Sequence, residues 1–227
     1  MLGQLMYDSE KKGRPKPETA GLYGLPVQRV VCSPDGFRAE RRLKQAGRLL
    51  ARAGCRRVLV PEGFCRWEVL RRYGLRPVDP VFFLRVHAVP LVMAGLKRQG
   101  KEPERCGVAL RGEQMERELA AAAEELCPLV KDVCISVPGG EVLRDHLRWE
   151  YGVAVRPDYP EVDGAVRFHA RTGEKGGIVL NLFPEELDLR GISVRAEGVE
   201  PGKTEYLPLL AALWEAGRIQ SHELEFT

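Results

Sequence analysis

Short apolar runs and helical repeats alternate along most of the chain. The runs are typical of buried strands, and the segments between them carry apolar residues every three to four positions, as amphipathic helices do. We expect strands at 28–33, 56–61, 75–78, 107–112, 132–138, 153–157, 165–170, 177–183 and 191–198. We expect helices at 37–54, 66–74, 80–100, 113–128, 141–152 and 204–217, with Pro90 kinking or splitting the third. This alternation predicts an α/β fold with a mostly parallel sheet.

The first 27 residues depart from this pattern. Residues 9–20 are polar, charged and contain two prolines, which favours an exposed arm or linker. The residues before them are too few to fold alone. We therefore expect an N-terminal arm over 1–27, a first α/β half over 28–105, and a second half over 106–227 that ends in a strand pair and a closing helix.

An internal echo supports a fold built from two similar halves. Residues 57–80 and residues 132–160 share the same order of features. Each has a strand, the motif Pro-x-Gly, a helix that contains Val-Leu-Arg, the pair Tyr-Gly, a short strand and the motif Pro-x-x-Pro. Each segment also follows a strand and an amphipathic helix, which makes two βαβαβ units, although any two βαβ units can share such punctuation. The element order over 28–196 resembles the broad Rossmann-like class, in particular nucleotide-binding-type domains whose glycine fingerprint has decayed. That resemblance implies helices on both faces of the sheet and a ligand site beyond the carboxyl ends of the strands.

The turns after the predicted strands are candidate ligand sites, because each precedes a helix whose free N–H groups can hold an anion. The candidate ligand-binding residues in them are Ser33, Asp35, Gly36, Glu62, Gly63, Arg111, Gly112, Glu113, Gly139 and Gly140. No turn carries the G-x-G-x-x-G that a pyrophosphate requires, and the carboxylates of Asp35 and Glu113 would repel a phosphate. We therefore expect no cofactor. Plain strand-to-helix connection is the favoured alternative for each turn taken singly.

The charge distribution is the largest departure from ordinary composition. The net charge of +3 divides into +1 for 1–28, +11 for 29–105 and −9 for 106–227. Arginines repeat on the polar face of the predicted helix 37–54, a footprint of phosphate-backbone binding. They are Arg38, Arg41, Arg42, Arg48 and Arg52. No aromatic residues interleave them, so a solvated face, or a homodimer that pairs the basic half with the acidic half, is favoured over nucleic-acid binding.

Recognisable catalytic chemistry is sparse. The six cysteines lack the spacing of a zinc or redox site, so we expect buried, reduced thiols and no metal. His169 lies on an alternating strand and is a candidate to face a cleft, but no nucleophile is paired with it. No apolar run reaches the roughly 18 residues of a membrane span, and the N-terminus lacks the features of a signal peptide. We expect a soluble cytoplasmic protein.

The function predicted from these observations is binding of an unidentified small ligand or of a protein, without identifiable catalytic machinery. Two alternatives remain open. One is a divergent NAD(P)-dependent oxidoreductase, and the other is a nucleic-acid-binding protein that uses the arginines of the basic half.

Overall fold

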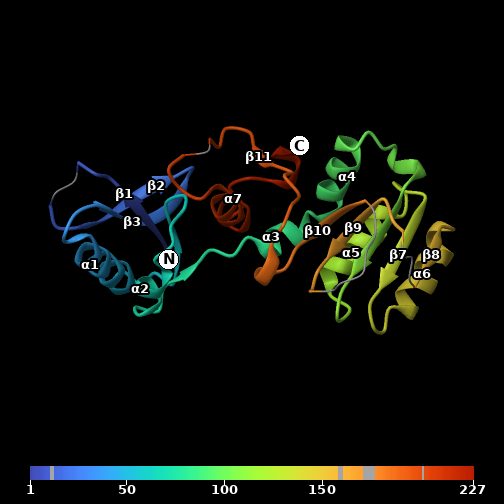
Figure 1. Cartoon of the computed structure of the whole chain (residues 1–227), viewed down its shortest axis with the longest axis horizontal. Coiled ribbons are helices and arrows are strands. Elements are labelled where there is room, and N and C mark those ends of the chain that lie inside the picture. Colours follow the sequence, from blue (N-terminus) through green and yellow to red (C-terminus); the bar gives the residue numbers. More distant parts are fainter. Residues whose placement is uncertain (11–12, 158–160, 171–176, 201) are drawn as a thin grey trace. The chain divides into compact units, whose positions relative to one another are not determined.

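The strands of the chain form a separate, mostly parallel sheet in each of two compact units. In this computed structural model, unit 1 comprises Met1–Pro80 and Arg195–Leu224, and unit 2 comprises Val81–Val194 and Glu225–Thr227 (Figure 1). The structure describes residues 1–10, 13–157, 161–170, 177–200 and 202–227. The chain thus passes from one unit to the other after Pro80, after Val194 and after Leu224, whereas the sequence predicts a division at residue 105.

The sheet of unit 1 has the strand order β2-β3-β1-β4-β5 within the described residues. Neighbouring strands run parallel except β2 and β3, which form an antiparallel hairpin. The strands are β1 (Leu2–Tyr7), β2 (Pro17–Leu22), β3 (Leu25–Cys32), β4 (Arg57–Leu59) and β5 (Arg76–Pro77).

The strand at the centre of this sheet is β1, although the sequence analysis expected an exposed arm over 1–27. Leu5 is fully buried and lies opposite Val30 of β3. A Cβ atom on Gly3 would lie 3.2 Å from side-chain atoms of Leu50 and Val58, which is tighter than an ordinary contact. The arm prediction is therefore wrong for β1 and β2, since the first residues of the chain are built into the core between β3 and β4.

Helices pack on both faces of the unit 1 sheet. The first helix, α1 (Ala39–Arg52), packs against β3 and against α2 (Trp67–Arg71). The last helix, α7 (Tyr206–Glu215), is connected to the opposite face of the sheet. The side chains of Gln4 and Arg57 project from that face. Arg57 forms a 2.5 Å ion pair with Glu215, and the Gln4 amide donates a 3.2 Å hydrogen bond to Thr204 just before the helix.

The sheet of unit 2 has the strand order β10-β9-β6-β7-β8 within the described residues, and every neighbouring pair is parallel. The strands are β6 (Gly107–Arg111), β7 (Asp132–Ser136), β8 (Ala154–Arg156), β9 (Gly164–Arg167) and β10 (Ile178–Asn181). If these five strands are numbered 1 to 5 in chain order, their order across the sheet from β8 to β10 is 3-2-1-4-5. This is the strand order of the doubly wound fold. The order reverses between β6 and β9, which is the switch point of this sheet.

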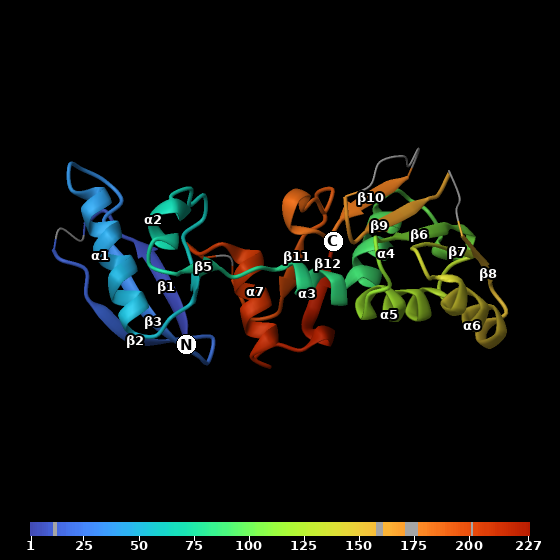
Figure 2. The same ribbon diagram turned by 90° about the horizontal axis from the view of Figure 1, so that it is seen from below.

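The helices of unit 2 are α3 (Val81–Val86), α4 (Ala88–Arg98), α5 (Arg117–Leu126) and α6 (Glu141–Tyr151). Figure 2 shows α4, α5 and α6 on one side of the sheet. Close approach of α4 depends on glycine, because a Cβ atom on Gly164 would lie 2.8 Å from Val92. The predicted helix over 80–100 is split at His87, which leaves Pro90 in the first turn of α4, where a missing N–H is tolerated.

Short elements complete the fold. A two-stranded sheet joins β11 (Val194–Ala196) to β12 (Leu224–Phe226), and the 3-10 helices are η1 (Pro103–Arg105), η2 (Pro184–Glu186) and η3 (Ser221–Glu223). The Asp163 carboxylate before β9 accepts hydrogen bonds from the Lys101 ammonium (2.6 Å) and the Gly107 N–H (2.9 Å). Burial alone raises the Asp163 pKa, but these two donors outweigh it, so its net pKa is lowered.

The predicted fold class is confirmed. The structure is a Rossmann-like α/β fold whose parallel sheets are flanked by helices, and it contains the βαβαβ runs β3-α1-β4-α2-β5 and β6-α5-β7-α6-β8. The two similar segments, residues 57–80 and 132–160, contain β4-α2-β5 and β7-α6-β8, and each lies at the edge of its sheet. Residues 171–176, which precede β10, lie outside the described residues. No helix in the described ranges is both long and apolar enough to cross a bilayer.

Candidate ligand site at the switch point of unit 2

Four polar residues end neighbouring strands at the carboxyl edge of the unit 2 sheet. Ser136, Arg111, Arg167 and Asn181 are aligned across β7, β6, β9 and β10, so their side chains leave the same face of the sheet. Asn181 is almost fully buried, and its Oδ1 atom has no hydrogen-bond partner among the described residues. Burial, together with the nearby charge of Arg111, lowers the pKa of Arg167. The edge where a doubly wound sheet binds its ligand therefore contains unusually polar strand ends.

The loop from β6 to α5 positions two glutamates at this edge. It turns at Gly112, where a Cβ atom would lie 3.1 Å from the Leu119 side chain and 3.3 Å from the carbonyl oxygen of Gln114. The loop then presents Glu113, whose side chain is 73% exposed, and ends at Glu116, the N-cap residue of α5. The helix predicted to begin at residue 113 begins instead at Arg117.

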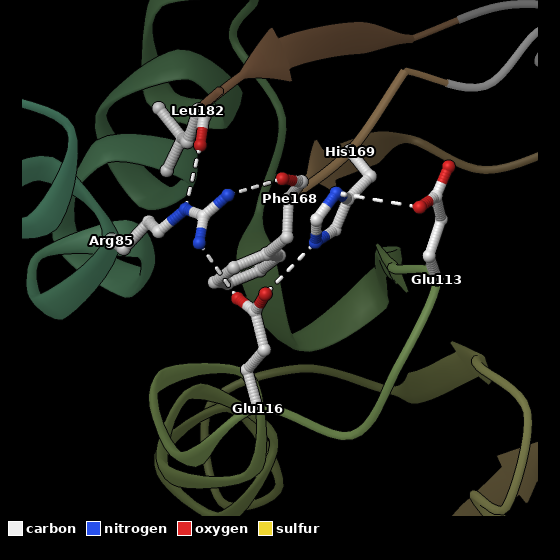
Figure 3. A network of polar contacts seen from close by, with 6 residues as sticks. All are labelled: Arg85, Glu113, Glu116, Phe168, His169 and Leu182. Atoms are coloured by element: carbon white, nitrogen blue, oxygen red, sulfur yellow. Dashed lines mark hydrogen bonds and ion pairs between the residues drawn. The ribbon is translucent and has the colours of Figure 1, made fainter. Parts of the chain in front are cut away.

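A hydrogen-bond network fixes the Glu116 carboxylate between Arg85 and His169 (Figure 3). The Arg85 guanidinium donates to Glu116 (2.7 Å), to the carbonyl of Leu182 (2.8 Å) and to the carbonyl of Phe168. The other carboxylate oxygen of Glu116 lies 2.8 Å from Nε2 of His169. Arg85 and Glu116 are mostly buried, with 15% and 14% of their side chains exposed, so they hold the imidazole ring in a fixed orientation.

The contact with Glu116 determines how His169 presents itself to the crevice. An ionised carboxylate only accepts hydrogen bonds, so Nε2 of His169 carries the hydrogen. In the neutral ring Nδ1 is then an acceptor, and it points toward the Glu113 carboxylate at a distance of 3.8 Å (Figure 3). With a neutral ring the site therefore sets two acceptors side by side, one of them an oriented imidazole, whereas a protonated ring donates from Nδ1 to Glu113.

A crevice of about 370 Å³ opens in front of these two acceptors. Its lining residues are Gly112, Glu113, Pro138, His169 and Ala170. They follow β6, β7 and β9, which places the crevice at the switch point, and its volume is in the range of small-molecule sites.

The structure distributes the ten predicted ligand-binding residues over both units. Ser33, Asp35, Gly36, Glu62 and Gly63 belong to unit 1, and Asp35 accepts a 3.0 Å hydrogen bond from the hydroxyl of Ser9. The other five belong to unit 2.

Of those five, Gly112 and Glu113 line the crevice, whereas Arg111 is buried at the end of β6. Gly139 adopts a positive φ of 75°, and Gly140 is the N-cap residue of α6. Arg85 and Glu116 carry no local signal of a site in the sequence, because both fall inside predicted helices. The sequence singles out His169 but not its partner Glu116.

The five arginines of the alternative nucleic-acid site lie in unit 1. Arg38 precedes α1, and the other four project from that helix. They line a second groove, of about 660 Å³, which is unrelated to the crevice of unit 2.

Comparisons with known proteins concern the fold. No family model matches the chain, and no curated protein matches it. Among solved structures, it is similar to L-tryptophan dehydrogenase from Nostoc punctiforme (14% identity, 73% of this chain and 55% of that chain, TM-score 0.30). It is also similar to TP0037 from Treponema pallidum, a D-lactate dehydrogenase (12% identity, 81% and 71%, TM-score 0.32). A third is the shikimate 5-dehydrogenase-like protein HI0607 (12% identity, 74% and 65%, TM-score 0.26).

The chain spans about half the length of the first of these proteins. At such identities and scores no activity of these proteins is carried over to this chain.

Proposed function

We propose that unit 2 binds a small, hydroxyl-bearing molecule without phosphate groups, of the nucleoside class, in the crevice at its switch point. The observation that carries this proposal is the pair of acceptors formed by His169 Nδ1 and the Glu113 carboxylate, 3.8 Å apart on the crevice. Neighbouring hydroxyls of a ribose ring can donate to two acceptors at that spacing.

The same residues argue against a dinucleotide. In the usual dinucleotide fold the pyrophosphate lies on the N-terminus of the helix after the first strand, which here is α5. That helix begins behind Glu113 and Glu116. The exposed Glu113 carboxylate opposes a phosphate charge at this position, whereas the charge of Glu116 is balanced by Arg85. Glu116 is also occupied by Arg85 and His169, so it cannot turn away without breaking both contacts.

The experiment is a calorimetric titration of the full chain with adenosine, S-adenosylmethionine, AMP and NADH. We expect adenosine or S-adenosylmethionine to bind, and AMP and NADH to bind more weakly. Glu113→Gln should weaken nucleoside binding about tenfold or more, because a hydrogen bond to a charged group contributes about 1.5–3 kcal/mol. His169→Ala should weaken it about two- to tenfold, because a hydrogen bond to the neutral ring contributes about 0.5–1.5 kcal/mol. Glu113→Gln should also reduce the difference in affinity between adenosine and AMP, because it removes the charge that repels phosphate.

The matched control is Glu124→Gln, which makes the same change at an exposed position near the far end of α5. It should leave every affinity unchanged. Tighter binding of NADH than of adenosine by the unmodified chain would favour the NAD(P)-dependent oxidoreductase and contradict the proposal. Failure of every hydroxylated probe to bind would contradict it as well.

We also propose a cytoplasmic location, supported by six free cysteine thiols, five of them buried, among the described residues. Fractionation of cells expressing the chain tests this location. A homodimer that pairs basic with acidic surfaces is the competing use of the basic surface, as an alternative to nucleic-acid binding. It predicts a mass by light scattering that falls from dimer to monomer as salt rises.

A further inference from the structure

A groove in unit 1 gathers basic side chains from two separate segments. The connection between β1 and β2 contributes Arg14, and α1 contributes most of the rest. The groove has a volume of about 660 Å³ and is also lined by Tyr73. The basic residues lining it, which we call the α1 groove, are Arg14, Arg38, Arg41, Arg42, Lys44, Arg48 and Arg52.

Most of these charges are not neutralised by another described residue. Lys44 forms a 2.5 Å ion pair with Glu40, and Arg42 donates a 3.0 Å hydrogen bond to the backbone carbonyl of Asp35. The remaining five side chains make no hydrogen bond or ion pair with another described residue. They are Arg14, Arg38, Arg41, Arg48 and Arg52.

The unit as a whole is also basic, with 20 Lys and Arg residues against 13 Asp and Glu residues. Unpaired cations along a concave surface attract a polyanion.

The charges are arranged for a chain of phosphates and not for a single anion. Arg41, Arg48 and Arg52 lie seven and four positions apart on one face of α1, a helix of 14 residues that is about 21 Å long. Phosphates of a helical nucleic-acid strand are spaced about 3.4 Å apart along its axis, so α1 spans about six of them. A lone phosphate would contact one or two of these arginines and leave the others unused.

Aromatic side chains beside the arginines favour a single strand. The sequence showed no aromatic residues among the basic ones, but folding brings Tyr73 into the groove, where its ring lies against Gly47. A Cβ atom at Gly47 would lie 2.8 Å from that ring. Phe37, next to Arg38, is fully exposed although it is a large apolar residue. Unpaired bases stack on such rings, whereas a duplex keeps its bases inside.

We propose that the α1 groove of unit 1 binds single-stranded nucleic acid, with the arginines on the phosphates and with Phe37 and Tyr73 available to the bases. A flat bilayer surface fits a concave groove less well. The proposal is independent of the crevice in unit 2, because no residue belongs to both sites.

The experiment is fluorescence anisotropy of labelled dT12 and rU12 with the full chain between 25 and 300 mM salt. With about five arginines on phosphates, we expect the logarithm of the association constant to fall with the logarithm of salt with a slope of about −3.5. The triple variant Arg41→Glu, Arg48→Glu, Arg52→Glu should bind at least about 100-fold more weakly at low salt and reduce the slope by about 2 units. Similar affinity for dT12 and rU12 supports backbone and base contacts alone, and preference for rU12 supports an added contact to the 2′-hydroxyl.

Two controls separate the groove from general charge. Arg56→Glu, Arg76→Glu and Arg218→Glu together reverse three exposed arginines of unit 1 outside the groove, and they should change the affinity less than about fivefold. Phe37→Ala removes an exposed ring, so it should leave the thermal midpoint unchanged, lower the affinity about fivefold or more, and keep the salt slope.

Several results would overturn the proposal. They are no binding of either oligonucleotide at 25 mM salt, equal losses for the two triple variants, and binding only to vesicles containing phosphatidylserine. A salt-sensitive homodimer that blocks the groove would overturn it too.

Discussion

Replacement of Leu5 by alanine tests whether the first residues of the chain form the central strand of unit 1. Leu5 is fully buried between β3 and β4 and belongs to the same core as Val30, Leu50 and Val58. An exposed N-terminal arm, which the sequence alone suggested, would place this side chain in water.

The expected cost follows from the burial of the whole isobutyl group. Its truncation loses about 2–3 kcal/mol of transfer free energy and adds a term for the cavity that neighbouring strands cannot close, for a total of about 3–4 kcal/mol. The same substitution in an exposed arm would change the free energy of unfolding by less than about 0.5 kcal/mol.

Urea denaturation followed by tryptophan fluorescence measures the difference within unit 1. Trp149 of unit 2 is almost fully exposed, so a Trp149→Phe background leaves Trp67 and Trp214, both in unit 1, as the probes. Phe37→Ala in the same background is the matched control, because that side chain is fully exposed. If Leu5→Ala unfolds at the same urea concentration as the control, β1 is not part of the core and the fold of unit 1 is wrong.

Three further predictions concern packing, pH and thiol chemistry. Gly164→Ala should destabilise unit 2 by about 1–3 kcal/mol in urea, because its Cβ atom would lie 2.8 Å from Val92, whereas Gly107→Ala, with 3.8 Å of room, should cost clearly less. Because the pKa of Asp163 is lowered in the folded chain, its carboxylate stabilises the fold at pH values above the ordinary pKa of aspartate. This stabilisation is lost as the pH falls through the lowered pKa. Asp163→Asn should therefore reduce the loss of thermal stability below about pH 4. Only Cys65 is exposed, so a disulfide reagent should modify one thiol quickly in the native chain and the others only after unfolding, and rapid modification of several would contradict the described burial.

The parts of the fold that the sequence predicted correctly are those whose signal is local. The runs that became β3-α1-β4-α2-β5 and β6-α5-β7-α6-β8 have clear apolar periodicity and turn residues at their ends. The central strand β1 was missed because its signal is not local. Gly3 and Gln4 are residue types that do not indicate a buried strand. In the folded chain, Leu50 packs against Gly3, and Gln4 is hydrogen-bonded to Thr204.

The candidate site was predictable to a similar extent. Its position at the strand ends and two of its lining residues, Gly112 and Glu113, follow from the Rossmann-like order. The network that orients His169 does not, because it joins Arg85, Glu116 and His169 across 84 positions of sequence. Glu116 resembled an ordinary first-turn acid of a helix, and only the fold shows that its carboxylate is held between two other side chains.

The central claim is that Glu116 fixes the orientation and tautomer of the His169 ring. Nitrogen-detected NMR of this ring tests it most directly, with the chain isotopically labelled at the histidine nitrogens. We predict that Nε2 carries the hydrogen in the neutral ring, that Glu116→Gln disturbs this preference, and that titration with adenosine shifts the Nδ1 resonance. A hydrogen on Nδ1 in the neutral ring, together with a His169 spectrum that no hydroxylated ligand changes, would contradict the account.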